Sequence, residues 1–417
     1  MKKDYTLVSL FCGAGGMDLG FKQAGFNILW ANDFDEDAVT TYRNNIGNHV
    51  VLGDICKIES DEIPDNPDVI IGGFPCQGFS VANTKRNMKD ERNFLYKEML
   101  RIIKDKQPKV FVAENVKGLL SMEKGKVIKM IVKDFEKIGY RVNYKVLNAA
   151  DYGVPQARER VIIIGNRIGV KNLYPKKTHT DKAKEQKTLF NSKHDLKPYV
   201  TTEEAIGFLY DVKITNNDLK VDGREIHNHI ASTNVSNKFW ARKHDVDQAE
   251  ICDYLRGWRN ASEWSTKKID NHFGYKHTAG HWFRKDNNSG TIPSPEDWWE
   301  LKKLLKFDDK YDKQVTELEE KEIVFEQSLR ITNWDRASDT ITATSPEIHV
   351  NKKRRLSARE CAILQTFPDD FIFYGSLSSM YSQIGNAVPV LLSNKIAKCI
   401  IKMLDNYKGD KNGFERN

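Results

Sequence analysis

The sequence predicts an α/β fold, with a doubly wound parallel sheet followed by a second, smaller domain of irregular structure. Two observations in the first 170 residues predict the sheet. Short β-branched or aromatic runs recur there, and stretches with apolar residues at helical spacing separate them. Such strands suit a sheet that helices cover on both faces. The third observation is a change of composition, because the alternation stops after Gly165.

The expected elements follow one another as repeated βαβ units. We expect strands at Leu7–Phe11, Ile28–Trp30, Val50–Leu52, Val69–Ile71, Val110–Ala113 and Val161–Ile164. The clearest helices are expected at Leu95–Lys106 and Lys126–Ile138, each between two of these strands.

The chain beyond the sheet has a different composition. Residues 171–199 hold eight lysines and three acids, which predicts a basic linker. Further on, six of the eight tryptophans fall between Trp240 and Trp299. A shift of this kind indicates a separate domain. Regular patterning resumes from about Arg354.

Composition excludes several classes of protein. The chain has 417 residues, enough for two or three domains. Its mean hydropathy is −0.58, and no apolar run approaches the ~18 residues of a membrane span, so we expect neither a membrane nor a secreted protein. Six widely spaced cysteines form no CxxC pair, which argues against a zinc site or a disulfide scaffold and indicates a reducing cytosol. The net charge of +7 permits a polyanionic partner without requiring one.

A glycine-rich turn, Phe11–Gly20, follows the first expected strand. Glycine lets the backbone turn sharply and approach a ligand closely. The spacing is not that of a dinucleotide fingerprint, because Asp18 stands where the third glycine would be. Asp33 follows the next strand and is placed to hydrogen-bond a ribose, and Asp54 follows the third strand in the same way. These features favour an adenosyl ligand, the alternative being ordinary polar residues at strand ends.

Three further motifs carry candidate chemistry. Cys76 lies in the loop Gly72–Ser80 after a buried strand, where open α/β sheets bind ligands; alternatively it is a buried structural thiol. Glu114 ends an apolar strand and can serve as a proton donor, or it is an acidic residue at a helix start. Gln156, Arg158 and Arg160 alternate along a strand, so they can share a face and bind an anion or a base edge, or form a solvated face. The carboxyl ends of the strands should bring these groups to one cleft.

These motifs make the chain resemble a cytosine-5 DNA methyltransferase of the bacterial restriction–modification type. The resemblance covers Phe11–Gly20, Asp33, Gly53–Ile55, Phe74–Gln77, Glu114–Val116, Gln156–Arg160, Arg355–Pro368 and Gln383–Pro389. It implies the Rossmann-like sheet of an S-adenosylmethionine-dependent methyltransferase, with a catalytic and cofactor-binding domain at 1–170. It also implies a target-recognition domain at 171–374, which includes the basic linker 171–199, and a C-terminal segment at 375–417 that returns to the catalytic domain. The family usually has Glu where this chain has Asp33.

The resemblance also implies roles for individual residues. The Cys76 thiolate would add to carbon 6 of a flipped-out cytosine, Glu114 would bond or protonate N3, and Arg160 with Arg158 would hold the base. The cofactor would contact Phe11, Ala14, Gly15, Gly16, Asp33, Phe34, Asp54, Ile55, Pro75, Leu95, Asn386 and Ala387. The substrate would contact Gln77, Ser80, Asn115, Gln156, Lys352 and Arg354. A mobile loop at 80–99 would close over DNA, and Lys352 to Arg355 with Arg359 would form a basic cluster for phosphates.

The expected partner is double-stranded DNA, modified at a specific site to protect the host, and a cognate restriction endonuclease encoded nearby. We expect a cytoplasmic, nucleoid-associated monomer that uses S-adenosylmethionine, releases S-adenosylhomocysteine and needs no metal. His277 and His281 have metal-like spacing, but no Glu or cysteine pair completes a zinc site. A tRNA cytosine-5 methyltransferase would share the catalytic residues and is the alternative; a recognition region of this size disfavours it. We expect base readout from irregular loops around Lys238–Asn288.

Overall fold

The computed structural model describes residues 4–75, 95–181, 196–233, 248–274, 295–316, 331–344, 346–351 and 354–407. By its internal contacts the chain forms two compact units. Unit 1 comprises residues 1–230, 333–344 and 357–417, and unit 2 comprises 231–332 and 345–356. Unit 2 falls within the range expected for target recognition, and that assignment stays a prediction. No helix in the described ranges is long and apolar enough to cross a membrane.

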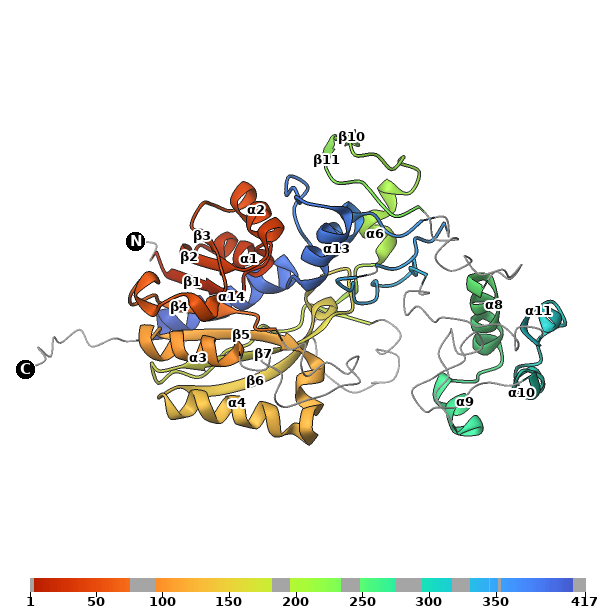
Figure 1. Cartoon of the computed structure of the whole chain (residues 1–417). Helices are drawn as coiled ribbons and strands as arrows, with labels where there is room; N and C mark the ends of the chain where they lie inside the picture. Colours follow the sequence, from red (N-terminus) through yellow and green to blue (C-terminus); the bar gives the residue numbers. More distant parts are fainter. Residues whose placement is uncertain are drawn as a thin grey trace, which may run out of the picture. The chain divides into compact units, whose positions relative to one another are not determined.

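A seven-stranded sheet organises unit 1, in the order β3-β2-β1-β4-β5-β7-β6 (Figure 1). The strands are β1 Thr6–Leu10, β2 Asn27–Asp33, β3 Val50–Leu52, β4 Val69–Gly72, β5 Val110–Val116, β6 Arg141–Asn148 and β7 Glu159–Asn166. Strands β1 to β5 are paired in parallel, whereas β7 is antiparallel to both β5 and β6. The α/β fold with a mostly parallel sheet is confirmed.

Two details of the expected sheet are wrong. Strand β6 was not expected, because this edge strand mixes polar and apolar residues and leaves Tyr144 and Val146 exposed. The last strand is not parallel to its neighbours. Only residues 149–158 separate β6 from β7, with one short 3-10 helix, η6 (Ala149–Tyr152). A parallel crossover needs about a dozen residues or more, so a connection of this length returns the chain antiparallel.

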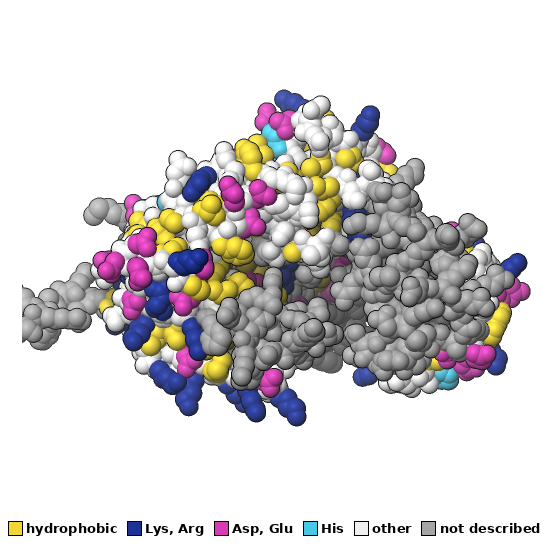
Figure 2. Space-filling model, in the orientation of Figure 1, with side chains coloured by type: hydrophobic (Ala, Val, Ile, Leu, Met, Phe, Trp, Pro, Cys, Tyr) yellow, Lys and Arg dark blue, Asp and Glu magenta, His cyan; other side chains and the backbone are white. Residues whose placement is uncertain are grey.

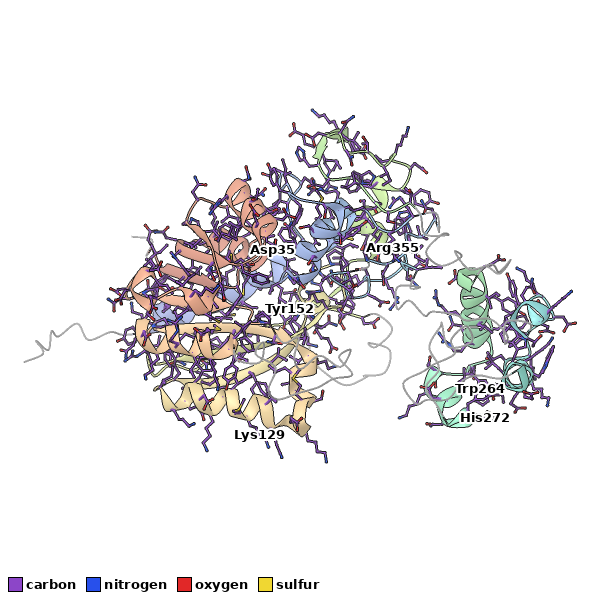
Figure 3. All side chains as sticks on the ribbon, viewed as in Figure 1. Asp35, Lys129, Tyr152, Trp264, His272 and Arg355 are labelled. Atoms are coloured by element: carbon purple, nitrogen blue, oxygen red, sulfur yellow. The ribbon has the colours of Figure 1, made fainter. Side chains whose placement is uncertain are left out.

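Helices pack on the sheet through amphipathic faces. Helices α3 (Leu95–Lys106) and α4 (Lys126–Lys137) share a core with β1, β4, β5 and β7. In α4 the residues Val127, Ile128, Ile131 and Phe135 are buried, and lysines occupy the solvent side. Lys129 points outward from α4 (Figure 3), and lysine and arginine side chains gather at the lower edge of unit 1 (Figure 2).

The C-terminal helix α14 (Val390–Asn406) packs on α1 (Gly16–Ala24) within unit 1. Ser393 Oγ donates to the carbonyl of Met17 at 2.6 Å, and Asn394 Nδ2 donates to the carbonyl of Gly20 at 3.1 Å. A Cβ on Gly20 would lie 2.5 Å from Ser393 Cβ and 2.6 Å from the carbonyl oxygen of Val390. The glycine therefore permits the close approach of the two helices.

Shorter elements complete unit 1. They are η1 Ile55–Lys57, η2 Ser60–Glu62, α2 Glu36–Asn45, η5 Lys117–Gly125, β8 His179–Thr180, β9 Lys197–Pro198, α6 Thr202–Ile206, η7 Gly207–Leu209, β10 Leu219–Val221, β11 Arg224–Ile226, α12 Ala358–Leu364 and α13 Leu377–Asn386.

The described part of unit 2 contains helices, whereas irregular structure was expected there apart from one helix beginning at Pro295. They are α8 Gln248–Ala261, α9 Thr266–Phe273, α10 Pro295–Leu305 and α11 Asp312–Thr316, around a core that includes Ile251, Ile269 and the fully buried Trp298. The expectation of irregular loops is wrong for residues 248–274. The helical signal was present, because Ile251, Tyr254, Leu255 and Trp258 recur at i, i+3, i+4 and i+7.

Candidate active site

The glycine-rich turn is anchored to the last residue of the neighbouring strand, β2. The backbone N–H of Gly13 donates to Asp33 Oδ2 at 2.7 Å, and the N–H of Asp35 donates to Asp33 Oδ1 at 3.0 Å. Phe11, Gly13 and Gly15 all have positive φ, so this turn needs the left-handed region repeatedly. Burial raises the pKa of Asp33, and the two backbone N–H groups oppose that rise. In this structure Asp33 joins two loops, and its contact with a ribose stays a prediction.

The surroundings of this turn fit an adenosyl group. Phe34 directly follows β2, and 72% of its surface is exposed, which is unusual for a large aromatic side chain. A Cβ placed on Gly13 would meet no described heavy atom within 4 Å, so there is space beside the turn. Asp54, after β3, is exposed and caps η1 by accepting from the N–H of Cys56 at 3.0 Å. An exposed ring, open backbone and a carboxylate therefore lie at the ends of adjacent strands.

The other expected cofactor residues divide by burial. Gly16 admits the returning chain, because a Cβ there would lie 2.7 Å from the carbonyl oxygen of Val388 and 3.0 Å from Ala387 Cβ. Asn386, which directly precedes Ala387, is exposed. The residues Ala14 and Ile55 are buried in the core, and Phe11, Pro75, Leu95 and Ala387 are partly exposed.

Sequence reasoning gave no role to Asp18, although it noted the residue. Asp18 is completely buried beneath the glycine turn and accepts from Ser9 Oγ and from the Tyr42 hydroxyl, both at 2.9 Å. Tyr42 also lies 3.0 Å from His49 Nε2. Burial raises the pKa of Asp18 to about 6, although the two hydroxyl donors lower it. The carboxyl group ties the first turn of α1 to β1 and α2.

Glu114 and Arg160 form a close pair where β5 and β7 meet. Glu114 Oε1 lies 2.7 Å from Arg160 Nε, and each side chain is only 11% exposed. Burial lowers the pKa of Arg160, and the charge of Glu114 raises it. Gly73 leaves room for the carboxylate, because a Cβ there would lie 3.0 Å from Glu114 Oε2. The antiparallel register, with Val116 opposite Arg160, brings the two strand ends together.

Asn115 connects β5 to the loop that leads to Cys76. Its side-chain Nδ2 donates to the carbonyl of Phe74 at 2.9 Å, and both residues are buried. Phe74 stands two residues before Cys76 in the sequence. Cys76, Gln77, Ser80 and Lys352 lie outside the described residues, as do residues 182–195 of the basic linker and His277 with His281. Elsewhere in the described part, no three His, Cys, Asp or Glu side chains gather as a metal site would require.

Arg158 and Gln156 bond the backbone of distant segments of unit 1. The Arg158 guanidinium is fully buried and donates to the carbonyls of Ile341, at 3.0 Å, and Gly385, at 2.6 Å. Gln156 Oε1 accepts from the N–H of Ile341 at 3.2 Å. Burial lowers the pKa of Arg158, and the neighbouring charge of Arg160 lowers it further. The alternation along this segment therefore brings only Arg160 to Glu114.

The expected basic cluster is wrong for two of its arginines. Arg359 is buried and donates to the carbonyls of His227, Pro368 and Phe371. Arg355, in unit 2, is buried and donates to the carbonyl of Pro346 at 2.7 Å. Arg354 is also buried and donates to the carbonyl of Arg355, and its contact with DNA stays a prediction. The run of basic residues in the sequence does not show that these guanidinium groups form hydrogen bonds with buried backbone carbonyls.

The sheet, the anchored glycine turn and the Glu–Arg pair are the arrangement expected of an α/β methyltransferase. The chain belongs to the family of C-5 cytosine-specific DNA methylases, which it matches over residues 5–402. It is therefore a DNA (cytosine-5) methyltransferase. It is 34% identical to the type II methyltransferase M.NgoFVII of Neisseria gonorrhoeae, over 96% of this chain and 88% of that protein. It is 33% identical to M.MthTI of Methanothermobacter thermautotrophicus, over 96% and 98%.

Solved structures support the fold. A protein encoded within an E. coli prophage matches 97% of this chain and 100% of its own, with a TM-score of 0.56 and 21% identity. A methyltransferase of Entamoeba histolytica matches 97% and 99%, with a TM-score of 0.51 and 14% identity.

Proposed function

We propose that this enzyme transfers a methyl group from S-adenosylmethionine to carbon 5 of a flipped-out cytosine in double-stranded DNA. In this proposal a covalent bond forms between Cys76 and carbon 6 of the base. The observation that carries the proposal is the buried pair of Glu114 and Arg160, at 2.7 Å, beside the strand from which Asn115 holds the Phe74 carbonyl. Both of these contacts come from the end of β5.

The chemistry explains why this set of groups is needed. Carbon 5 of cytosine is a weak nucleophile, and addition of the Cys76 thiolate to carbon 6 converts the ring to a nucleophilic enamine. Negative charge develops toward N3 during this addition, and Glu114 forms a hydrogen bond with that atom or protonates it. Arg160 fixes the Glu114 carboxyl group and donates to the cytosine carbonyl. After the methyl group is transferred, loss of the carbon-5 proton and of Cys76 restores the aromatic ring.

The residues around the glycine turn fit the cofactor. Bound S-adenosylmethionine supplies a methyl group activated by its sulfonium. Phe34 would stack on the adenine, and Asp54 would accept from the adenine amino group. Asp33 would hold the ribose, while its bonds to Gly13 and Asp35 keep the turn in place.

Arg158 takes a different role from Arg160 in this proposal. Its guanidinium holds Ile341 and Gly385, and Gly385 directly precedes Asn386. We assign Arg158 as a positioning residue that fixes the segment containing Asn386 and Ala387. Its effect on the reaction would therefore appear through cofactor binding.

The named relatives suggest the biological setting. Two of them, from Neisseria gonorrhoeae and Methanothermobacter thermautotrophicus, are type II methyltransferases. We propose that this enzyme likewise protects host DNA in a restriction–modification system, as a cytoplasmic monomer beside a cognate endonuclease. The catalytic domain would comprise 1–170, the recognition domain 171–374, and the returning segment 375–417.

Transfer of a labelled methyl group tests the proposal directly. The wild-type enzyme should label duplex DNA but not tRNA, and duplex DNA with 5-fluorocytosine at the target should trap an adduct that survives denaturation. Cys76→Ala should abolish both results and retain cofactor binding, whereas Cys56→Ala, at an exposed cysteine, should retain both. Preferential labelling of tRNA would instead support the alternative substrate. Activity of Cys76→Ala above a few per cent would contradict the covalent step.

A further inference from the structure

The helices of unit 2 form a scaffold with its own core. Ile251 of α8, Ile269 of α9 and Trp298 of α10 are buried together, with Leu301, Leu305, Phe307, Tyr311 and Val315. The indole N–H of Trp298 donates to Asp312 at 2.9 Å, which joins α10 to α11. Trp264 and His272, at the two ends of α9, stack edge to face with ring centroids 6.1 Å apart (Figure 3). Helix α9 therefore rests on a packed support.

The connection between α8 and α9 is short and well defined. Helix α8 ends at Ala261 and α9 begins at Thr266. Glu263, between them, has φ of 57°, and Ser265 caps α9 by accepting from the N–H of Lys268 at 3.2 Å. A connection of three or four residues between two helices is one feature of the helix-turn-helix, in which the second helix enters the major groove of DNA.

The two sides of α9 differ in chemistry. Ile269 and Phe273 face the core of unit 2, whereas Lys267, Lys268 and Asn271 are exposed. Lys267 and Asn271 are four residues apart, so they lie on one face of the helix. Neither side chain has a hydrogen-bond or ion-pair partner among the described residues.

Two other lysines of unit 2 are used within the protein. Lys302 pairs with Asp309 and Asp312, and Lys310 pairs with Glu250 at 2.9 Å. The sequence that follows α9, residues 275–288, adds Lys276, Arg284 and Lys285 against one acid, Asp286. Helix α9 itself carries two lysines, Lys267 and Lys268, against one acid, Asp270, and it lies in a stretch of sequence with net positive charge, which complements the charge of DNA.

We propose that α9 enters the major groove of the target DNA and that Lys267 and Asn271 read base edges there. The inference rests on the proposed action on double-stranded DNA. An asparagine amide can bond both N6 and N7 of adenine, and a lysine ammonium can bond O6 and N7 of guanine. Lys268, on the flank of the same face, donates to the carbonyl of Glu263 at 3.5 Å and has further donors suited to a phosphate.

Discrimination between single base pairs tests this assignment in the full-length enzyme. Bisulfite sequencing of DNA methylated by the wild type defines the site, and kcat/KM is then measured on duplexes that each differ from it at one base pair. Asn271→Ala and Lys267→Ala should each lose about tenfold or more of the discrimination at one position, with the other positions unchanged. Lys303→Ala removes an exposed charge from α10 and should leave the whole profile unchanged.

A variant that replaces the donor of Asn271 by an acceptor sharpens the test. Asn271→Asp presents only acceptors, so the preference at its position should move from adenine toward cytosine, whose N4 amino group donates. Unchanged profiles in all the α9 variants would overturn the assignment, and so would a uniform loss on every duplex, which is typical of phosphate contacts. Thermal melting of each variant checks that it is folded. A wild type that methylates no duplex would overturn the proposed function itself, which the wild-type assay alone reveals.

Discussion

Arg160 Nε lies 2.7 Å from Glu114 Oε1, across the antiparallel pairing of β7 with β5. The two residues are 46 positions apart in the sequence, and they meet because β7 runs opposite to β5 and begins where β5 ends. If the last strand were parallel, Arg160 would lie near the amino end of β5, at the opposite end of the strands from Glu114. The reversal of this one strand therefore assembles the pair that we assign to base recognition.

We expect Glu114→Gln to lower kcat by about 10²- to 10⁴-fold, the range typical for loss of a general acid. The amide keeps the shape of the side chain but cannot supply the proton. Cofactor affinity, measured by calorimetry, should stay nearly unchanged. Glu159→Gln is the matched control, because Glu159 is the more exposed acid at the start of β7 and pairs with Lys117. Weaker cofactor binding with unchanged turnover would move Glu114 to the cofactor site.

Phe34→Ala should weaken cofactor binding by about 1–3 kcal/mol, which is the range for stacking between a base and an aromatic ring. The free energy of unfolding should change little, because the ring is 72% exposed and contributes little to the core. The Kd for S-adenosylhomocysteine and the melting temperature measure the two effects separately. Phe34→Tyr retains a ring and should bind normally. Equal affinities for the wild type and Phe34→Ala would exclude stacking on Phe34.

Gly20→Ala should destabilise the protein by about 1–3 kcal/mol, the usual range for overpacking. The added Cβ would lie 2.5 Å from Ser393 Cβ and 2.6 Å from the Val390 carbonyl, so α14 must move away from α1. Gly257→Ala in α8 is the control, because a Cβ there meets no described atom within 4 Å. It should raise stability by about 0.5–1 kcal/mol through helix propensity. Chemical denaturation followed by circular dichroism measures both changes.

Asp18→Asn should remove part of the pH dependence of stability. Burial raises the pKa of Asp18 from 3.8 to about 6, so between these values the folded protein binds more protons than the unfolded chain. The contribution of Asp18 to stability is therefore lost as the pH rises from about 4 to 6, by on the order of 3 kcal/mol. The unfolding free energy of the variant minus that of the wild type should therefore become more positive over this window and level off above it. A difference that is constant with pH would contradict the raised pKa.

Local sequence determined much of the fold and of the site. Short apolar strands and amphipathic helices fix the α/β sheet, because burial on both faces demands such runs. The sequence also placed Asp33 and Glu114 at strand ends, because a polar residue directly after an apolar run indicates where a buried strand ends. Periodicity alone could not detect β6, whose residues at the sheet edge meet solvent and need no apolar pattern.

Only the tertiary structure decided which charged residues remain available for chemistry. Arg158, Arg160 and Arg359 are the same residue type in the sequence. In the structure Arg158 and Arg359 donate to backbone carbonyls, whereas Arg160 pairs with Glu114. Likewise, Lys302 is paired with acids, whereas Lys267 has no partner among the residues described. A charged group's role depends on which donors and acceptors surround it, and these come from segments far apart in the chain. The sequence determined where strands and motifs lie, and the packing of distant segments determined which groups those motifs can use.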